Sequence, residues 1–130
     1  MVEWLFRKTG PVIWDATIGN IQNKGIRDIP IQTPAKDAYD IAKQGYGLIL
    51  TDNNKPIGVL EFFQISEDDI AKNKPVNQLN YFPAEVKDQG TKVREVYEEL
   101  EKGKAVLVKG AGDKITGVVT MSDYSRKRFT

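Results

Sequence analysis

The 130-residue sequence predicts a mixed α/β fold of the α+β type, in which one set of elements is built twice. The first observation is an internal repeat, because the segment that begins at Thr33 aligns with the segment that begins at Thr91, 58 positions later. The second is the order of patterns within each copy. A stretch with apolar residues at helical spacing precedes two short β-rich runs that flank a polar turn. Each copy is therefore expected to contain a helix, a strand–turn–strand hairpin and a second helix.

The two copies stay in register over most of the chain, with one extra loop residue before the last matched run. This register predicts an N-terminal extension over 1–17, a first repeat over 18–75 and a second repeat over 76–130. The matches are Ile18 with Val76, Ile21 with Leu79, Tyr39 with Tyr97, Gly45 with Gly103, 48–50 with 106–108, and 58–60 with 117–119.

A short extended piece and then a helix are expected at the start of each copy. Thr33 and Thr91 are predicted N-caps, with Pro34 as a first helical residue. Gly45 and Gly103 are predicted to end the two helices as C-cap glycines. The apolar positions at helical spacing are Ala35, Ala38, Ile41 and Ala42 in one helix, and Val93, Val96, Tyr97 and Leu100 in the other.

Hairpins are expected to follow these helices. In the first copy, strands over 48–51 and 57–60 flank the polar turn 52–55. In the second copy, strands over 105–108 and 115–120 flank a glycine-rich turn. That turn precedes a strand, whereas a phosphate-binding loop opens a helix, so it is interpreted as a hairpin turn.

Second helices are predicted over 66–73 and 122–128. The acidic run after Ser66 could suggest a metal site, but Ser66 and Asp69 have the spacing of a capping box. We therefore interpret the run as the first turn of a helix and expect no metal ligands here.

Composition excludes several classes of chemistry. The chain has neither Cys nor His, so it has no thiolate nucleophile, no imidazole base and no zinc site of the usual kind. Its 19 basic and 18 acidic residues argue against a nucleic-acid partner. Apolar runs are far shorter than the ~20 residues that a membrane span needs. These features favour a cytoplasmic binding or regulatory protein that is not an enzyme.

The second copy ends in Gly117-Val-Val-Thr120-Met-Ser122-Asp123, and this string within a repeat resembles the CBS (cystathionine-β-synthase) domain family. Tandem CBS pairs form Bateman modules. The resemblance implies two βαββα repeats packed sheet to sheet with pseudo-two-fold symmetry, often as homodimers that form a disc of four domains. It also implies a bound adenosyl ligand, namely AMP, ADP, ATP or S-adenosylmethionine, and an effector protein that senses it.

In that family the signature Asp, here Asp123, takes the ribose hydroxyls, and the Thr, here Thr120, lies near the phosphates. The physics agrees, because a carboxylate can accept from both hydroxyls of a cis-diol. A purely structural alternative remains open, with Ser122 as a helix N-cap. By analogy the first repeat would hold the adenine, and basic residues of the second repeat would contact phosphate. The implied ligand-binding residues are Thr120, Ser122, Asp123, Ile26, Arg27, Ile29, Tyr46, Gly47, Lys104 and Arg126.

The first repeat departs from the signature, with Glu61 and Gln64 at the positions of Thr120 and Asp123. Because Glu61 would repel a phosphate, we expect one competent site per chain. The alternative functions are a ligand-free dimerisation module, or a regulatory fragment of a larger enzyme or transporter. In the N-terminal extension, the apolar residues are expected to pack rather than to stack on adenine. They are Trp4, Leu5, Phe6 and Trp14.

Overall fold

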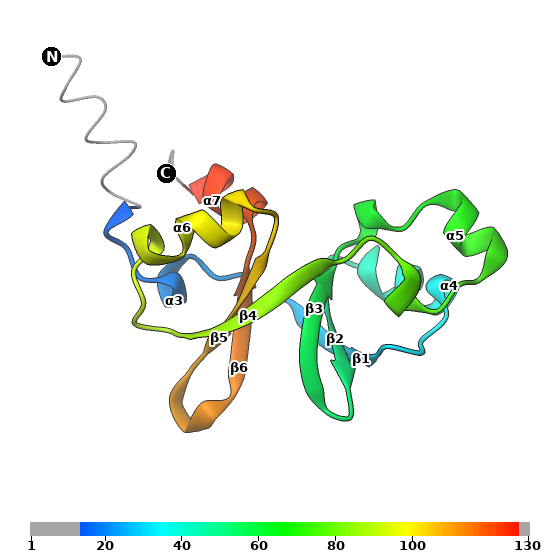
Figure 1. The fold of residues 1–130 in the computed structure, drawn as a ribbon, viewed down its shortest axis with the longest axis horizontal. Helices are drawn as coiled ribbons and strands as arrows, with labels where there is room; N and C mark the ends of the chain where they lie inside the picture. Colours follow the sequence, from blue (N-terminus) through cyan, green and yellow to red (C-terminus); the bar gives the residue numbers. More distant parts are fainter. Residues whose placement is uncertain (1–13, 128–130) are drawn as a thin grey trace, which may run out of the picture. The chain divides into compact units, whose positions relative to one another are not determined.

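The structure, a computed structural model, describes residues 14–127 and the side chains of residues 14–126. The described residues fold into two compact units (Figure 1). The first-repeat unit is Gly25–Ala84, and the second-repeat unit combines the residues up to Lys24 with those from Glu85 onward. Along the chain, the boundaries between these units fall after Lys24 and after Ala84, whereas the boundary between the two sequence repeats falls after residue 75. Residues 1–13 of the predicted extension 1–17, including Trp4, Leu5 and Phe6, lie outside the described residues.

Strands β1 (Ile26–Pro30), β2 (Gly47–Asp52) and β3 (Lys55–Leu60) form the sheet of the first-repeat unit. Strand β1 pairs with β2 in parallel, and β2 pairs with β3 in antiparallel orientation. Strand β4 (Phe82–Asp88) joins the edge of β3 through its first residues and then continues into the second-repeat unit. The predicted hairpin of the first copy is confirmed.

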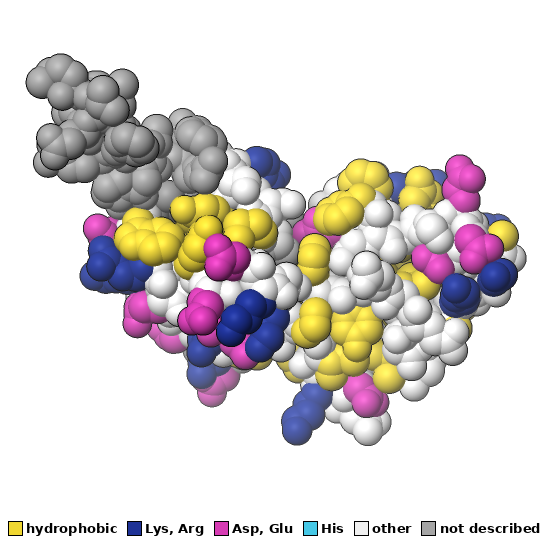
Figure 2. Space-filling view, turned by 45° about the horizontal axis from the view of Figure 1, so that its top comes forward, with side chains coloured by type: hydrophobic (Ala, Val, Ile, Leu, Met, Phe, Trp, Pro, Cys, Tyr) yellow, Lys and Arg dark blue, Asp and Glu magenta, His cyan; other side chains and the backbone are white. Residues whose placement is uncertain are grey.

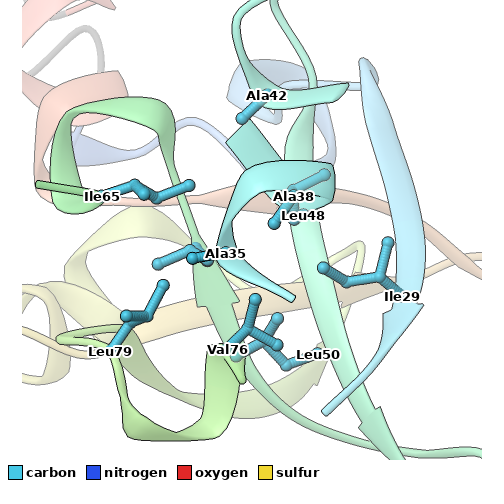
Figure 3. Packing of buried hydrophobic residues seen from close by; sticks show 10 residues of the cluster. Ile29, Ala35, Ala38, Ala42, Leu48, Leu50, Ile65, Val76 and Leu79 are labelled. Atoms are coloured by element: carbon cyan, nitrogen blue, oxygen red, sulfur yellow. The ribbon is translucent and has the colours of Figure 1, made fainter. Parts of the chain in front are cut away.

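Helices α4 (Ala35–Ala42) and α5 (Glu67–Lys72) pack on this sheet, together with the short 3-10 helices η1 (Phe62–Gln64) and η2 (Val76–Gln78). Figure 3 shows the apolar side chains of these elements gathered between strands and helices. The core contains the predicted helical positions Ala35, Ala38 and Ala42, all of them buried.

The second-repeat unit repeats this plan with strands β5 (Ala105–Lys109) and β6 (Ile115–Val119), which pair antiparallel. Helices α3 (Ile18–Ile21), α6 (Val93–Glu101) and α7 (Met121–Lys127) accompany them, and the glycine-rich segment forms the hairpin turn around η3 (Ala111–Asp113). Trp14 packs edge-on against Tyr97 of α6, which confirms the packing role predicted for that tryptophan.

Each sequence repeat opens with a short segment that packs in the unit formed by the other repeat. Val76 and Leu79, at the start of the second repeat, belong to the core of the first-repeat unit. Ile18 and Ile21, at the start of the first repeat, belong to the core of the second-repeat unit. The two units are therefore built from exchanged, equivalent segments, which explains why their boundaries differ from those of the sequence repeats.

Backbone hydrogen bonds hold these exchanged segments in place. In the first-repeat unit, the Val76 N–H donates to the Thr33 carbonyl at 2.9 Å, and the Ala35 N–H donates to the Lys74 carbonyl at 2.7 Å. The same two bonds recur in the second-repeat unit. There the Ile18 N–H donates to the carbonyl of Thr91 at 2.8 Å.

These bonds correct the predicted helix starts. Thr33 and Thr91 are not N-caps, and Pro34 is not the first helical residue. Helix α4 has its N-cap at Pro34 and helix α6 has its N-cap at Lys92, both with extended backbone. Pairing with the exchanged segments keeps residues 33–34 and 91–92 extended, so that each helix starts one or two residues later than its sequence suggests.

The predicted helix ends and turns are confirmed. Gly45 and Gly103 have φ of 103° and 84°, the left-handed region that glycine occupies at helix C-termini. In the turn between β2 and β3, Asn53 and Asn54 both have positive φ, as a two-residue hairpin turn requires. No helix within residues 14–127 has the length and apolar character needed to cross a membrane.

Candidate functional site

The signature residues of the second copy lie where strand β6 ends and helix α7 begins. Thr120 follows β6 directly, and Asp123 lies in the first turn of α7. Thr120 is 1% exposed and Asp123 is 3% exposed, and no other polar or charged side chain of residues 14–126 is buried. A buried carboxylate needs hydrogen-bond donors, so its contacts decide what the site can do.

Both oxygens of the Asp123 carboxylate are engaged. Oδ2 accepts the Thr120 backbone N–H at 2.8 Å and the Thr120 hydroxyl at 3.1 Å. Oδ1 accepts the guanidinium of Arg126, one helical turn further along α7. The structure therefore brings together three of the predicted residues, Thr120, Asp123 and Arg126, through one carboxylate.

Ser122 does not take part in this arrangement. Helix α7 begins at Met121, one residue earlier than predicted, so that Ser122 lies exposed within the first turn. The alternative in which Ser122 is the N-cap is therefore wrong. The helix start is held by the bond from the Thr120 N–H to Asp123, because a carboxylate three residues into the turn can reach back to that donor.

The first copy makes the equivalent bond without a carboxylate. Gln64 occupies the position of Asp123, and its Oε1 accepts the Glu61 backbone N–H at 2.9 Å. The amide nitrogen of Gln64 donates to the Asn80 carbonyl at 2.7 Å. The backbone bond is thus a structural property of both repeats. What distinguishes the second copy is the charge of Asp123 and the hydroxyl of Thr120.

Lys104, a predicted phosphate contact, lies directly before β5 and is half-buried. Its Nζ pairs with Oε1 of Glu85 on strand β4 at 3.2 Å. Glu85 was not predicted from the sequence, because it lies 19 positions from Lys104 and no local pattern connects these two residues. Any phosphate that Lys104 contacts has to compete with this carboxylate.

The predicted residues of the first copy lie in the first-repeat unit, on and beside strands β1 and β2. Ile26 is paired with Gly47 in the parallel register. Arg27 lies over the ring of Tyr46, with Cζ 4.5 Å from the ring centroid, and donates to the Tyr46 hydroxyl at 3.4 Å. One face of Tyr46 is therefore covered by a cation.

Ile29 is 5% exposed and its side chain belongs to the apolar core of the first-repeat unit. The predicted residues thus form two groups, each within its own unit. Their joint role in one ligand site stays a prediction.

The structure explains why glycine stands at position 117, the first residue of the signature string. A Cβ at this position would lie 2.3 Å from Oε1 of Gln22 and 2.7 Å from the carbonyl oxygen of Asn23. Asn23 and Val118 exchange two backbone hydrogen bonds at 2.8 and 3.0 Å, which hold the exchanged segment against β6. Glycine is therefore required for the close approach of two backbones.

Charge on the visible surface is mixed. In Figure 2 the Lys and Arg side chains alternate with Asp and Glu, without an extended field of one sign on the face in view. Among the described residues, no group of three or more acidic side chains is placed to hold a metal ion. The site therefore consists of a buried, hydrogen-bonded carboxylate with an exposed cation beside it.

The described residues thus form a tandem-repeat module of two exchanged α+β repeats, one of which carries a buried Thr–Asp pair at a strand–helix junction. No protein-family model matches the sequence, and no curated protein matches it. Solved structures do match, and CBS-domain proteins are among the most similar. The chain has the fold of a tandem CBS domain pair, a Bateman module.

Three of these structures show how far the likeness extends. A hemolysin-like CBS-domain protein of Oenococcus oeni PSU matches with a TM-score of 0.72 and 15% identity, over 96% of this chain and 98% of that one. The CBS domain of a bacterial CNNM/CorC family Mg²⁺ transporter, in complex with ATP, gives 0.68 and 12%, over 99% and 97%. The CBS domain pair of protein MJ0100, in complex with 5′-methylthioadenosine and S-adenosyl-L-methionine, gives 0.64 and 19%, over 85% and 94%.

Proposed function

We propose that this chain is a regulatory module that binds an adenosyl ligand, one molecule per chain, and performs no catalysis of its own. The ligand would be AMP, ADP, ATP or S-adenosylmethionine, held with the participation of Thr120 and Asp123. An effector protein in the cytoplasm would respond to the bound form. Such a response requires that the ligand prefer one arrangement of the module over another.

The observation that carries the proposal is the buried carboxylate of Asp123. Burying a charged group costs free energy, and the equivalent position in the first repeat performs the same structural task with a neutral amide. The local fold therefore does not need a charge at residue 123. A carboxylate is the better acceptor for the two hydroxyls of a ribose, which supplies a reason for the charge.

The solved structures support the choice of ligand class. The transporter CBS domain is in complex with ATP, and the MJ0100 pair is in complex with two adenosyl compounds. The absence of His and Cys agrees with a site that holds its ligand by a hydroxyl, a carboxylate and backbone amides.

Isothermal titration with AMP, ATP and S-adenosylmethionine tests the proposal. We expect at least one of them to bind the wild-type chain, and we expect Asp123→Asn to weaken it by about tenfold or more, as loss of a charge-assisted hydrogen bond predicts. Gln64→Glu is the matched control, since it changes the equivalent residue of the other repeat and should leave the affinity within about twofold. Equal binding by wild type and Asp123→Asn, or no binding of any of the three compounds, would contradict the proposal.

A second candidate function is a ligand-free dimerisation module, and a cluster of exposed aromatic side chains favours it. Phe62 and Phe63 of η1 are 54% and 57% exposed, and Phe63 lies edge-on to Phe82. Large exposed aromatic residues are typical of protein interfaces. If these residues form a homodimer, light scattering of the wild-type chain gives a dimer mass and Phe62→Ser/Phe63→Ser gives a monomer mass. A wild-type monomer at the highest soluble concentration removes this candidate.

A further inference from the structure

Arg126 is the one exposed residue of the Thr120–Asp123–Arg126 group. Its side chain is 68% exposed, whereas that of Asp123 is 4% exposed. The guanidinium donates to Oδ1 of Asp123, and in the part of the chain that the structure describes no second acceptor for it is found. A long, solvent-exposed side chain with one ionic contact can leave that contact at small cost.

Asp123 does not have enough free acceptor positions for a ribose while Arg126 is in place. Its two oxygens offer about four lone-pair positions in total. Oδ2 already accepts two hydrogen bonds from Thr120, and Oδ1 accepts one from Arg126. One position is left, but a cis-diol presents two hydroxyl donors. Binding of the diol through both hydroxyls therefore requires Arg126 to move away.

Displacement of Arg126 has different consequences for different ligands. A nucleoside without phosphate takes the Asp123 carboxylate away from the Arg126 guanidinium and offers that guanidinium no other anion. A nucleotide removes the same partner but brings a phosphate, which guanidinium groups bind bidentately. Lys104, which directly precedes the strand paired with β6, already has a carboxylate partner in Glu85. The exposed guanidinium is thus the cation most readily transferred from the protein to the ligand.

We propose that Arg126 determines specificity: it occupies the ribose-binding oxygen of Asp123 in the free protein and moves to the phosphate when a nucleotide binds. This inference rests on the proposed adenosyl-binding function. Arg126 acts as a competitor against unphosphorylated adenosine and as a partner of AMP. The selectivity between the two ligands then resides in one side chain rather than in the shape of a pocket.

The test compares the dissociation constants of adenosine and AMP for wild type, Arg126→Gln and Arg126→Lys by isothermal titration. In Arg126→Gln we expect adenosine to bind about two- to fivefold more tightly, because the competing exposed ion pair is gone. AMP should bind about fivefold more weakly, since the phosphate loses an ionic partner. The ratio of the dissociation constant of adenosine to that of AMP then falls by about ten- to twenty-five-fold.

Two further variants separate specificity from structure. Arg126→Lys keeps the positive charge and should keep AMP as the tighter ligand. Arg94→Gln removes a guanidinium on α6 that pairs with Asp15, and it should leave the ratio within about twofold. Circular dichroism checks that each variant is folded.

The possible outcomes separate the role of Arg126 from the proposed function. An unchanged ratio in Arg126→Gln, or a parallel weakening of both ligands, overturns the role of Arg126 and leaves the proposed function standing. If wild type binds ATP or S-adenosylmethionine but neither adenosine nor AMP, the role of Arg126 is overturned and the proposed function stands. If wild type binds none of these compounds, the proposed function fails and the inference fails with it.

Discussion

Replacement of Asp123 should affect stability in a way that depends on the shape of the new side chain more than on its charge. Asp123→Ala removes the acceptor of the Thr120 N–H and hydroxyl at a residue that is 1% exposed. Loss of a helix cap costs about 1 kcal/mol, and a buried donor left without a partner raises this to about 2 kcal/mol. Asp123→Asn keeps an amide oxygen for the Thr120 N–H and loses only the pair with the exposed Arg126, worth less than about 1 kcal/mol.

Thermal denaturation followed by circular dichroism measures this difference directly. For a chain of this size 1 kcal/mol corresponds to a shift in Tm of about 3–5 °C, so we expect Tm to fall by about 6–10 °C for Asp123→Ala and by less than about 4 °C for Asp123→Asn. Gln64→Ala is the control in the other repeat, where loss of the bond to the half-buried Glu61 N–H should cost about 1 kcal/mol. Equal destabilisation of the chain by Asp123→Asn and Asp123→Ala would contradict the role given to the Thr120–Asp123 hydrogen bonds.

Two other predictions follow from single contacts. Ala at Gly58 or Gly117 should cost about 1–3 kcal/mol in urea denaturation, because the new Cβ would lie within 3 Å of neighbouring backbone; Gly90→Ala, whose nearest neighbour is 3.2 Å away, should cost far less, and equal costs would contradict the account. The pKa of Asp69 is lowered from its usual 3.8, chiefly by the hydrogen bond from the Ser66 backbone N–H. The resulting stabilisation is present above the usual pKa and is lost as the pH falls through the lower, folded value. Wild type should therefore lose more stability than Asp69→Asn between pH ~5 and ~2, and a parallel loss in both would show that this carboxylate does not contribute.

Much of the fold could be predicted from the sequence because its signals are local. Gly45 and Gly103 mark helix ends since few other residues adopt their backbone conformation, and this is what the structure shows. The spacing of Ser66 and Asp69 alone predicts a capping box, and both of its hydrogen bonds are present at 3.0 Å.

The exchange of the opening segments could not be predicted, because a repeat in sequence shows which residues are equivalent but not which copy each one contacts. Ile18 matches Val76 in sequence, yet each packs on the helix of the other repeat. The shifted helix starts have the same cause. They depend on backbone bonds between residues that are about 40 or more positions apart in the sequence.

The sequence predicted the central residues of the candidate site but not the residues that surround them. Thr120 and Asp123 were identified by their motif, and their contact is confirmed. The partners that limit the site were not identified. Glu85 beside Lys104 and the cation over Tyr46 are contacts across strands, for which the sequence contains no local signal.

Native mass spectrometry of the chain with saturating AMP tests the central claim most directly, since it counts bound molecules per chain. We expect one AMP per chain for wild type and for Gln64→Glu, and a clearly lower bound fraction for Asp123→Asn at the AMP concentration that just saturates wild type. Two molecules per wild-type chain would contradict the assignment of the site to the second repeat alone. No bound AMP, ATP or S-adenosylmethionine on the wild-type chain would contradict adenosyl binding itself.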